Sequence, residues 1–179
     1  MALTATIYKA QIELSHIDSH IYESINLTIA KHPSETPARM MFRLLAYLYC
    51  YCEKLEFTKG ISTTEEPDIW LKNYSGDIEL WIELGFPEPK RIKQALARSS
   101  KVVVFTYQPN RVSEWETKIS AQSFSPERFQ AFHFTSDDGA LEALAERTME
   151  LSCIIEDGNI TLANAKEHAL VRVKNYTNP

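Results

Sequence analysis

A chain of 179 residues with 44% hydrophobic and 24% charged residues is an ordinary globular composition, and it is long enough for one domain with its own core. The net charge of -5 argues against a large sequence-independent nucleic-acid surface but is compatible with a local basic cleft. No apolar run approaches the roughly 20 residues of a membrane span, and no secretion signal precedes the first predicted strand. We therefore expect a single cytoplasmic domain over residues 1–179, with no membrane partner.

The amino-terminal part is predicted to begin with two strands and a helix. Residues 4–17 and 21–30 alternate between apolar and polar side chains, which is typical of an antiparallel hairpin. Thr36 suits the N-cap of the helix and Pro37 its first position, and helical apolar spacing extends to about Phe57.

Three charged residues are spaced four apart around the start of this helix: Glu35, Arg39 and Arg43. Residues at this spacing lie on one edge of a helix and can form ion pairs. Two interpretations follow from the spacing. The cluster is either a solvated charged edge with an intrahelical ion pair, or one wall of a functional cleft.

The central residues, 65–107, are predicted to form a strand, a turn, a second strand, a helix and a third strand. Side chains alternate on the second strand, so Glu79, Trp81 and Glu83 point away from the face formed by Ile78, Leu80, Ile82 and Leu84. Asp68 and Trp70 take the matching face of the first strand. Asp68 and Glu83 should therefore share a face. The two tryptophans beside them would either stack a nucleic-acid base or be packed under another element.

The strand–helix–strand unit that follows determines the class of the sheet. Helical spacing covers residues 88–99 and buries Ile92 and Ala95, and it leaves the cations Lys90, Arg91 and Lys93 available. The continuous β-branched run at 101–107 is typical of a strand that is covered on both faces. A crossover of this length implies a parallel pair, so the sheet is mixed.

The remaining elements complete an α/β fold with a mixed sheet and an appended β section from the two chain ends. Helices are predicted at 110–122 and 140–147, and strands at 129–134, 149–156, 160–163 and 169–173. The three cysteines, Cys50, Cys52 and Cys153, lack CxxC spacing and are predicted to be free thiols.

Two carboxylates on neighbouring strands can hold a hard divalent cation, so Asp68 and Glu83 are candidate ligands for Mg²⁺. Paired strand carboxylates followed by a helix and a buried strand resemble the core of the PD-(D/E)xK nuclease superfamily. That resemblance implies metal-assisted phosphodiester cleavage, in which a lysine lies two residues after the second acid. This sequence has Gly85 at that position. The substitute would come from the following helix, as Arg91, Lys93 or the nearby Lys90.

The segments HPSETPARMMFRLLAYL, EEPDIWL, WIELGFPEPKRIKQA, VVVFTY and EDGNI together resemble, from end to end, the YaeQ family of small bacterial proteins. That family is regarded as a variant of the PD-(D/E)xK fold. The resemblance implies a PD-(D/E)xK nuclease-like core with a cleft formed by Asp68, Glu83, and Arg91 or Lys93, and with Glu35 and Arg39 as further lining. Glu66 would replace Asp68 as the first acid if the strand register differs by a residue or two.

Two functional hypotheses therefore remain open at the level of sequence. The first is a Mg²⁺-dependent nuclease that acts on nucleic acid through Asp68, Glu83 and a substituted helix cation. The second is an inactive protein of nuclease-like fold that serves as a binding or regulatory module. The retained acids favour the first hypothesis and Gly85 favours the second.

Overall fold

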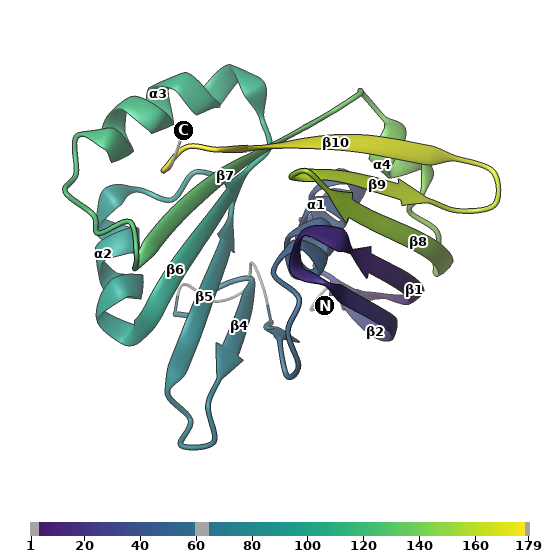
Figure 1. The fold of residues 1–179 in the computed structure, drawn as a ribbon, viewed down its shortest axis with the longest axis horizontal. Helices are drawn as coiled ribbons and strands as arrows, with labels where there is room; N and C mark the ends of the chain where they lie inside the picture. The colour runs from purple at the N-terminus through teal and green to yellow at the C-terminus, as the bar shows by residue number, and fades with distance from the viewer. Residues whose placement is uncertain (1–3, 60–64, 178–179) are drawn as a thin grey trace. The chain divides into compact units, whose positions relative to one another are not determined.

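The computed structural model describes residues 4–59 and 65–177, and these group into two compact units (Figure 1). The first unit contains the described residues up to Cys50 together with Ser136–Val173. The second contains the described residues from Tyr51 to Thr135 and the segment that begins at Lys174. The expectation of a single domain over the whole chain stays a prediction.

The first unit combines strands from both ends of the chain in one sheet. Its strands are β1 (Thr6–His16), β2 (Ile21–Lys31), β8 (Thr148–Glu156), β9 (Asn159–Ala163) and, up to Val173, β10 (His168–Asn175), in the order β2-β1-β8-β9-β10. The predicted hairpins β1–β2 and β8–β9 are confirmed as antiparallel pairs. The parallel pair β1–β8 was not predicted, and it joins the amino-terminal hairpin to the carboxyl-terminal strands.

The helices of the first unit differ in length from the prediction. The α1 helix (Pro37–Tyr49) starts as expected, because the Thr36 hydroxyl accepts a hydrogen bond from the Arg39 N–H at 3.1 Å. It ends at Tyr49 rather than near Phe57, with Cys50 as its C-cap, and the chain then turns through a positive φ of 69° at Lys54 before the short strand β3 (Glu56–Phe57). The α4 helix (Ala140–Ala143) is also shorter than predicted, and a 3-10 turn, η1 (Ile17–Ser19), joins β1 to β2. The predicted β section from the two chain ends thus shares its unit with the helical segments α1, η1 and α4.

The second unit has a mixed sheet, as the strand–helix–strand pattern predicts. Its strands are β3, β4 (Ile69–Lys72), β5 (Ile78–Leu84), β6 (Ser99–Thr106) and β7 (Phe129–Ser136), in the order β7-β6-β5-β4-β3. The β5, β6 and β7 strands are parallel, whereas β4 pairs antiparallel with both β3 and β5. The buried run of β6 lies in the middle of the parallel part, which explains its lack of alternation.

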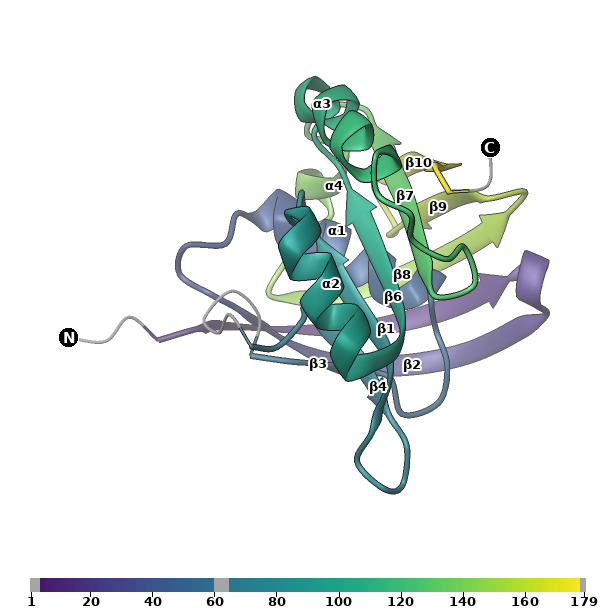
Figure 2. The same cartoon turned by 90° about the vertical axis from the view of Figure 1, so that its left-hand side faces the viewer.

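Two helices, α2 (Pro89–Arg98) and α3 (Pro109–Ser120), lie on the same face of this sheet (Figure 2). They pack with the sheet in a core that contains Trp81, Ile92, Ala95, Val102, Val104, Trp115, Ile119, Phe129 and Ala131. Trp81 is only 1% exposed, so the interpretation in which it is packed under another element is the correct one. Trp70 is half-buried, with the Lys72 ammonium 3.5 Å from the centre of its ring.

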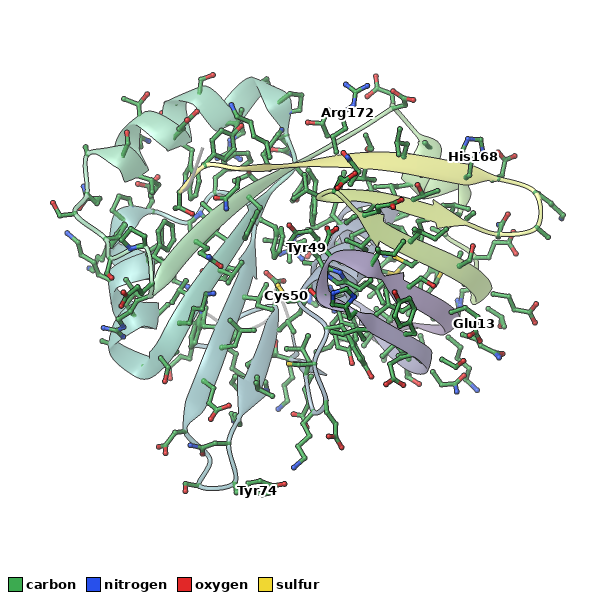
Figure 3. The ribbon with its side chains drawn as sticks, viewed as in Figure 1. Glu13, Tyr49, Cys50, Tyr74, His168 and Arg172 are labelled. Carbon is green, nitrogen blue, oxygen red and sulfur yellow. The ribbon has the colours of Figure 1, made fainter. Side chains whose placement is uncertain are left out.

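The β4–β5 turn follows the predicted turn chemistry. The Asn73 side-chain oxygen accepts hydrogen bonds from the N–H groups of Ser75 and Asp77, both at 2.9 Å. Tyr74 extends from the tip of this hairpin and is 97% exposed (Figure 3). All three cysteines are free, as predicted. None of the helices in the described part of the chain is long and apolar enough to cross a bilayer.

Candidate functional site

The hairpin brings Asp68 and Glu83 together in the second unit. Asp68 immediately precedes β4, and its N–H donates a hydrogen bond of 3.1 Å to the Ile82 carbonyl of β5. The Oδ2 atom of the Asp68 side chain accepts a hydrogen bond of 2.8 Å from the N–H of Leu84, the residue that follows Glu83 on β5. Both acids are buried, with 6% of Asp68 and 8% of Glu83 exposed. The two acids thus share a face of the sheet, as strand alternation predicts, but both side chains are buried rather than exposed to solvent.

Arg91 is the cation that contacts the acids. Its Nε lies 2.7 Å and its Nη2 2.5 Å from Glu83 Oε1, and Nη2 also donates to the Glu66 carbonyl at 2.9 Å. The helix α2 places it there because its first turn starts only five residues after β5 ends. Lys90 and Lys93, the other candidate cations, are exposed on the same helix.

Glu66, the alternative first acid, contacts this site through its backbone carbonyl. The partner of Asp68, the Leu84 amide, is likewise a backbone group, and sequence reasoning had no signal by which to find it.

Glu83 lies in an electrostatic environment that opposes its charge. Burial raises the pKa of the Glu83 carboxyl, and the neighbouring Asp68 charge raises it further, whereas the hydrogen bond and the charge of Arg91 lower this pKa. Glu83 Oε2 is buried and has no hydrogen-bond partner among the described residues, and the same holds for the indole nitrogen of Trp81. The Trp81 N–H is close enough to lower the pKa of Glu83, but it does not meet hydrogen-bond geometry. Glu83 Oε2 is therefore a buried hydrogen-bond acceptor that lacks a donor among the described residues.

Gly85 departs from strand geometry. The β5 strand ends at Leu84, and Gly85 has a φ of +108° while its N–H donates to the Phe105 carbonyl at 2.9 Å. In a strand that continued past Leu84, a lysine at this position would share the face of Glu83, but β5 ends before it. A Cβ atom at Gly85 would meet no atom within 4 Å, so the obstacle to a Cβ is backbone strain rather than space.

We expect the Gly85→Lys variant to lose about 1–2 kcal/mol of unfolding free energy, because a positive φ disfavours residues that have a Cβ. Urea denaturation followed by tryptophan fluorescence measures this loss. The control is Glu79→Lys, which adds a lysine at an exposed position of β5. A Gly85→Lys variant as stable as the control would contradict the strained backbone at this position.

Glu35 and Arg39, the predicted cleft-lining residues, belong to the first unit and bind each other. Arg39 Nη1 lies 2.8 Å from Glu35 Oε1, and Arg43 donates from Nε to Oε1 at 3.0 Å and from Nη2 to Oε2 at 2.8 Å. Arg43 Nη2 also donates to the Ala30 carbonyl of β2 at 3.0 Å. Glu35 is 3% and Arg43 2% exposed. The expected ion pair between residues four apart is thus present, but the edge is not solvated, because Glu35 and Arg43 are buried, Arg39 is half-buried and both Glu35 oxygens are bound.

The described residues contain no group of three or more His, Cys, Asp or Glu side chains that could hold a metal ion. The side-chain ligands that this site offers a cation are the Asp68 and Glu83 carboxylates. That donor set suits Mg²⁺, which is commonly held by one or two carboxylates and completes its shell with water or substrate phosphates.

These features define a mixed α+β protein with a buried acidic pair beside an arginine. The sequence model of the YaeQ protein family matches residues 1–173, and the chain therefore belongs to the YaeQ family. It is 38% identical to proteins described as uncharacterized YaeQ proteins from Escherichia coli (strain K12) and Salmonella typhi, over 100% of this chain and 99% of each relative.

Solved structures agree with this assignment. The crystal structure of the YaeQ protein from Xanthomonas axonopodis pv. citri matches with a TM-score of 0.91 at 34% identity, covering 98% of this chain and 100% of the other. The YaeQ protein from Pseudomonas syringae matches with a TM-score of 0.85 at 31% identity, over 96% of this chain and 95% of the other.

Proposed function

We propose that this protein is a Mg²⁺-dependent phosphodiesterase that acts on nucleic acid, with a PD-(D/E)xK-like core formed by the second unit. The observation that carries the proposal is Glu83 Oε2, a buried carboxylate oxygen without a hydrogen-bond partner among the described residues, beside a second buried carboxylate. An unsatisfied buried acceptor costs about 1–3 kcal/mol, and more when it is charged. A divalent cation between Asp68 and Glu83 would remove this cost.

In this proposal Asp68 and Glu83 hold the cation, which when bound polarises a phosphodiester and lowers the pKa of bound water. Arg91 supplies the positive charge that a lysine at position 85 would supply in the nuclease superfamily, because its guanidinium contacts the Glu83 carboxylate and is always charged. The Leu84 N–H fixes the orientation of Asp68 through a backbone hydrogen bond.

The proposal is tested first by calorimetric titration of Mg²⁺ and Mn²⁺ into the wild type, Glu83→Gln and Asp68→Asn. We expect saturable binding by the wild type and its loss in both variants, because each removes one of two carboxylate ligands. Glu79→Gln, which removes an exposed carboxylate from the same strand, should bind as the wild type does. Equal binding by all four proteins would place the cation elsewhere and contradict the proposal.

The same four proteins are then assayed for cleavage of single-stranded DNA, duplex DNA and RNA in Mg²⁺ and Mn²⁺. We expect cleavage of at least one substrate by the wild type and the Glu79→Gln control, and none above background by Glu83→Gln.

A second candidate function, that of a non-catalytic binding or regulatory module of the same fold, is favoured by Gly85. Its positive φ disfavours a lysine at the position where that superfamily carries one. The two functions differ in a direct way. A binding module would retain a nucleic-acid or protein ligand without cleaving it, and Glu83→Gln would then leave the affinity for that ligand unchanged.

A further inference from the structure

A polar cavity of about 260 Å³ lies beside α2 in the second unit. It is lined by Glu65, Trp81, Arg91, Gln94, Ala95 and Arg98. The four α2 residues follow helical spacing and therefore form one stripe along the helix. We call this cavity the α2 pocket. Its walls present two guanidinium groups and one amide, against the single acidic side chain of Glu65.

Two side chains at the α2 pocket, Arg98 and Gln94, have hydrogen-bond donors left over for a ligand. Arg98 forms no ion pair among the described residues, and its hydrogen bond is a long one of 3.4 Å from Nη1 to the Glu65 carbonyl. The Gln94 amide is exposed and has no hydrogen-bond partner in the described part of the chain.

Arg91 connects the α2 pocket to the acidic pair. Its guanidinium carbon lies 5.2 Å from the centre of the Trp81 ring, and Trp81 contributes to the pocket lining. The Trp81 indole N–H is a further donor that is buried without a hydrogen-bond partner among the described residues. The nearby carboxylate of Glu83 binds Arg91 through Oε1, whereas its Oε2 has no hydrogen-bond partner among the described residues, and Glu83 is not part of the pocket lining. The side chains that line the pocket itself carry more hydrogen-bond donors than acceptors.

We propose that the α2 pocket binds a phosphate group. Guanidinium groups match the oxygen geometry of phosphate with paired hydrogen bonds, and Arg98 and Gln94 are free to donate to it from the same side of the helix. The bound phosphate group is either inorganic phosphate or the terminal phosphate of an oligonucleotide, because both present the same tetrahedral oxyanion. This site goes beyond the proposed function, because it requires neither a metal ion nor cleavage.

The test is a titration of inorganic phosphate into the ¹⁵N-labelled protein at low ionic strength and without divalent cations. We expect the Trp81 indole, the Gln94 amide and the backbone amides of α2 to shift in a saturable way. Arg98→Gln should weaken phosphate binding about tenfold or more, because it removes a charged hydrogen-bond donor. Lys118→Gln, which removes an exposed cation from α3 in the same unit, should bind as the wild type does.

A parallel titration with a short oligonucleotide, with and without a 5′-phosphate, separates the two sources. Tighter binding of the phosphorylated strand than of inorganic phosphate would assign the site to a strand end, and equal affinity would assign it to free phosphate. The proposal is overturned if no residue of the pocket shifts up to about 10 mM phosphate, or if Arg98→Gln binds as tightly as the wild type. Acetate that binds as well as phosphate would likewise overturn the ligand class. None of these failures bears on the Glu83 metal titration, because Glu83 is unchanged and metal is absent.

Discussion

Replacing Glu35 by alanine will lower the free energy of unfolding by about 3–5 kcal/mol, which is the usual effect of removing one partner from a buried ion pair. The reason is that Arg43, only 2% exposed, would keep its charge in the interior and lose the carboxylate that its Nε and Nη2 now bind. Arg39→Ala should have a smaller effect, because the Arg39 side chain is 17% exposed and Glu35 would still bind Arg43. Urea denaturation followed by far-ultraviolet circular dichroism measures both variants.

The double variant Glu35→Leu/Arg43→Met separates a structural role of this cluster from a role in a cleft. Replacing a buried ion pair as a whole by apolar side chains is often neutral or stabilising, so we expect the double variant to recover most of the stability that Glu35→Ala loses. If the double variant is stable and retains metal binding and cleavage, Glu35 has no part in the chemistry. Equal stability of Glu35→Ala and the wild type would contradict the buried network.

Replacing Arg91 by glutamine will destabilise the second unit by an amount that increases with pH. Burial raises the pKa of Glu83 in the folded protein, so between the ordinary glutamate value and this raised pKa the folded state binds more protons than the unfolded state. Stability from this group is therefore present at low pH and is lost as the pH rises through that window. Arg91 opposes the loss, because its hydrogen bond and charge lower the pKa of Glu83.

Without Arg91 the pKa of Glu83 rises further, and the cost of ionising this carboxyl in the folded state grows. We expect Arg91→Gln to lower the free energy of unfolding by about 1–3 kcal/mol at pH 8, which is the usual effect of leaving a buried polar group, here the Glu83 carboxylate, without its hydrogen-bond partner. The cost should be much smaller at pH 4, where Glu83 is protonated. All three tryptophans of the chain, Trp70, Trp81 and Trp115, belong to the second unit, so urea denaturation followed by tryptophan fluorescence at pH 4, 6 and 8 reports on this unit.

Two further variants define the controls for this pH dependence. The Glu83→Gln/Arg91→Gln double variant has no carboxyl to titrate at position 83, so its difference from the wild type should lack the steep part of the pH profile. Lys118→Gln removes an exposed cation of the same unit and should differ little from the wild type at any pH. A cost of Arg91→Gln that stays constant between pH 4 and 8 would refute the coupling between Arg91 and the ionisation of Glu83.

The sequence by itself determined most of the local structure and the face on which the candidate acids lie. The β4–β5 hairpin, the α2 crossover and the parallel β5–β6 pair follow from alternation, helical spacing and the buried run of β6, all of which are local patterns. The shared face of Asp68 and Glu83 also followed, because strand periodicity is fixed at two. The Glu35–Arg39 pair followed as well, because residues four apart on a helix lie on one edge.

Only the tertiary structure decided which charges are paired and buried. It selected Arg91 over Lys90 and Lys93 as the partner of Glu83, because all three are cations on one short helix and only the packing of α2 on the sheet sets their directions. It also replaced the predicted end of α1 by the strand β3, because Glu56 and Phe57 pair with β4 although helical spacing extends to them. The positive φ of Gly85 is likewise fixed by its backbone hydrogen bond to Phe105 of β6, a contact between segments that are distant in sequence. Local patterns carry no information on such contacts, because their free energy depends on desolvation and on geometry that exist only in the assembled fold.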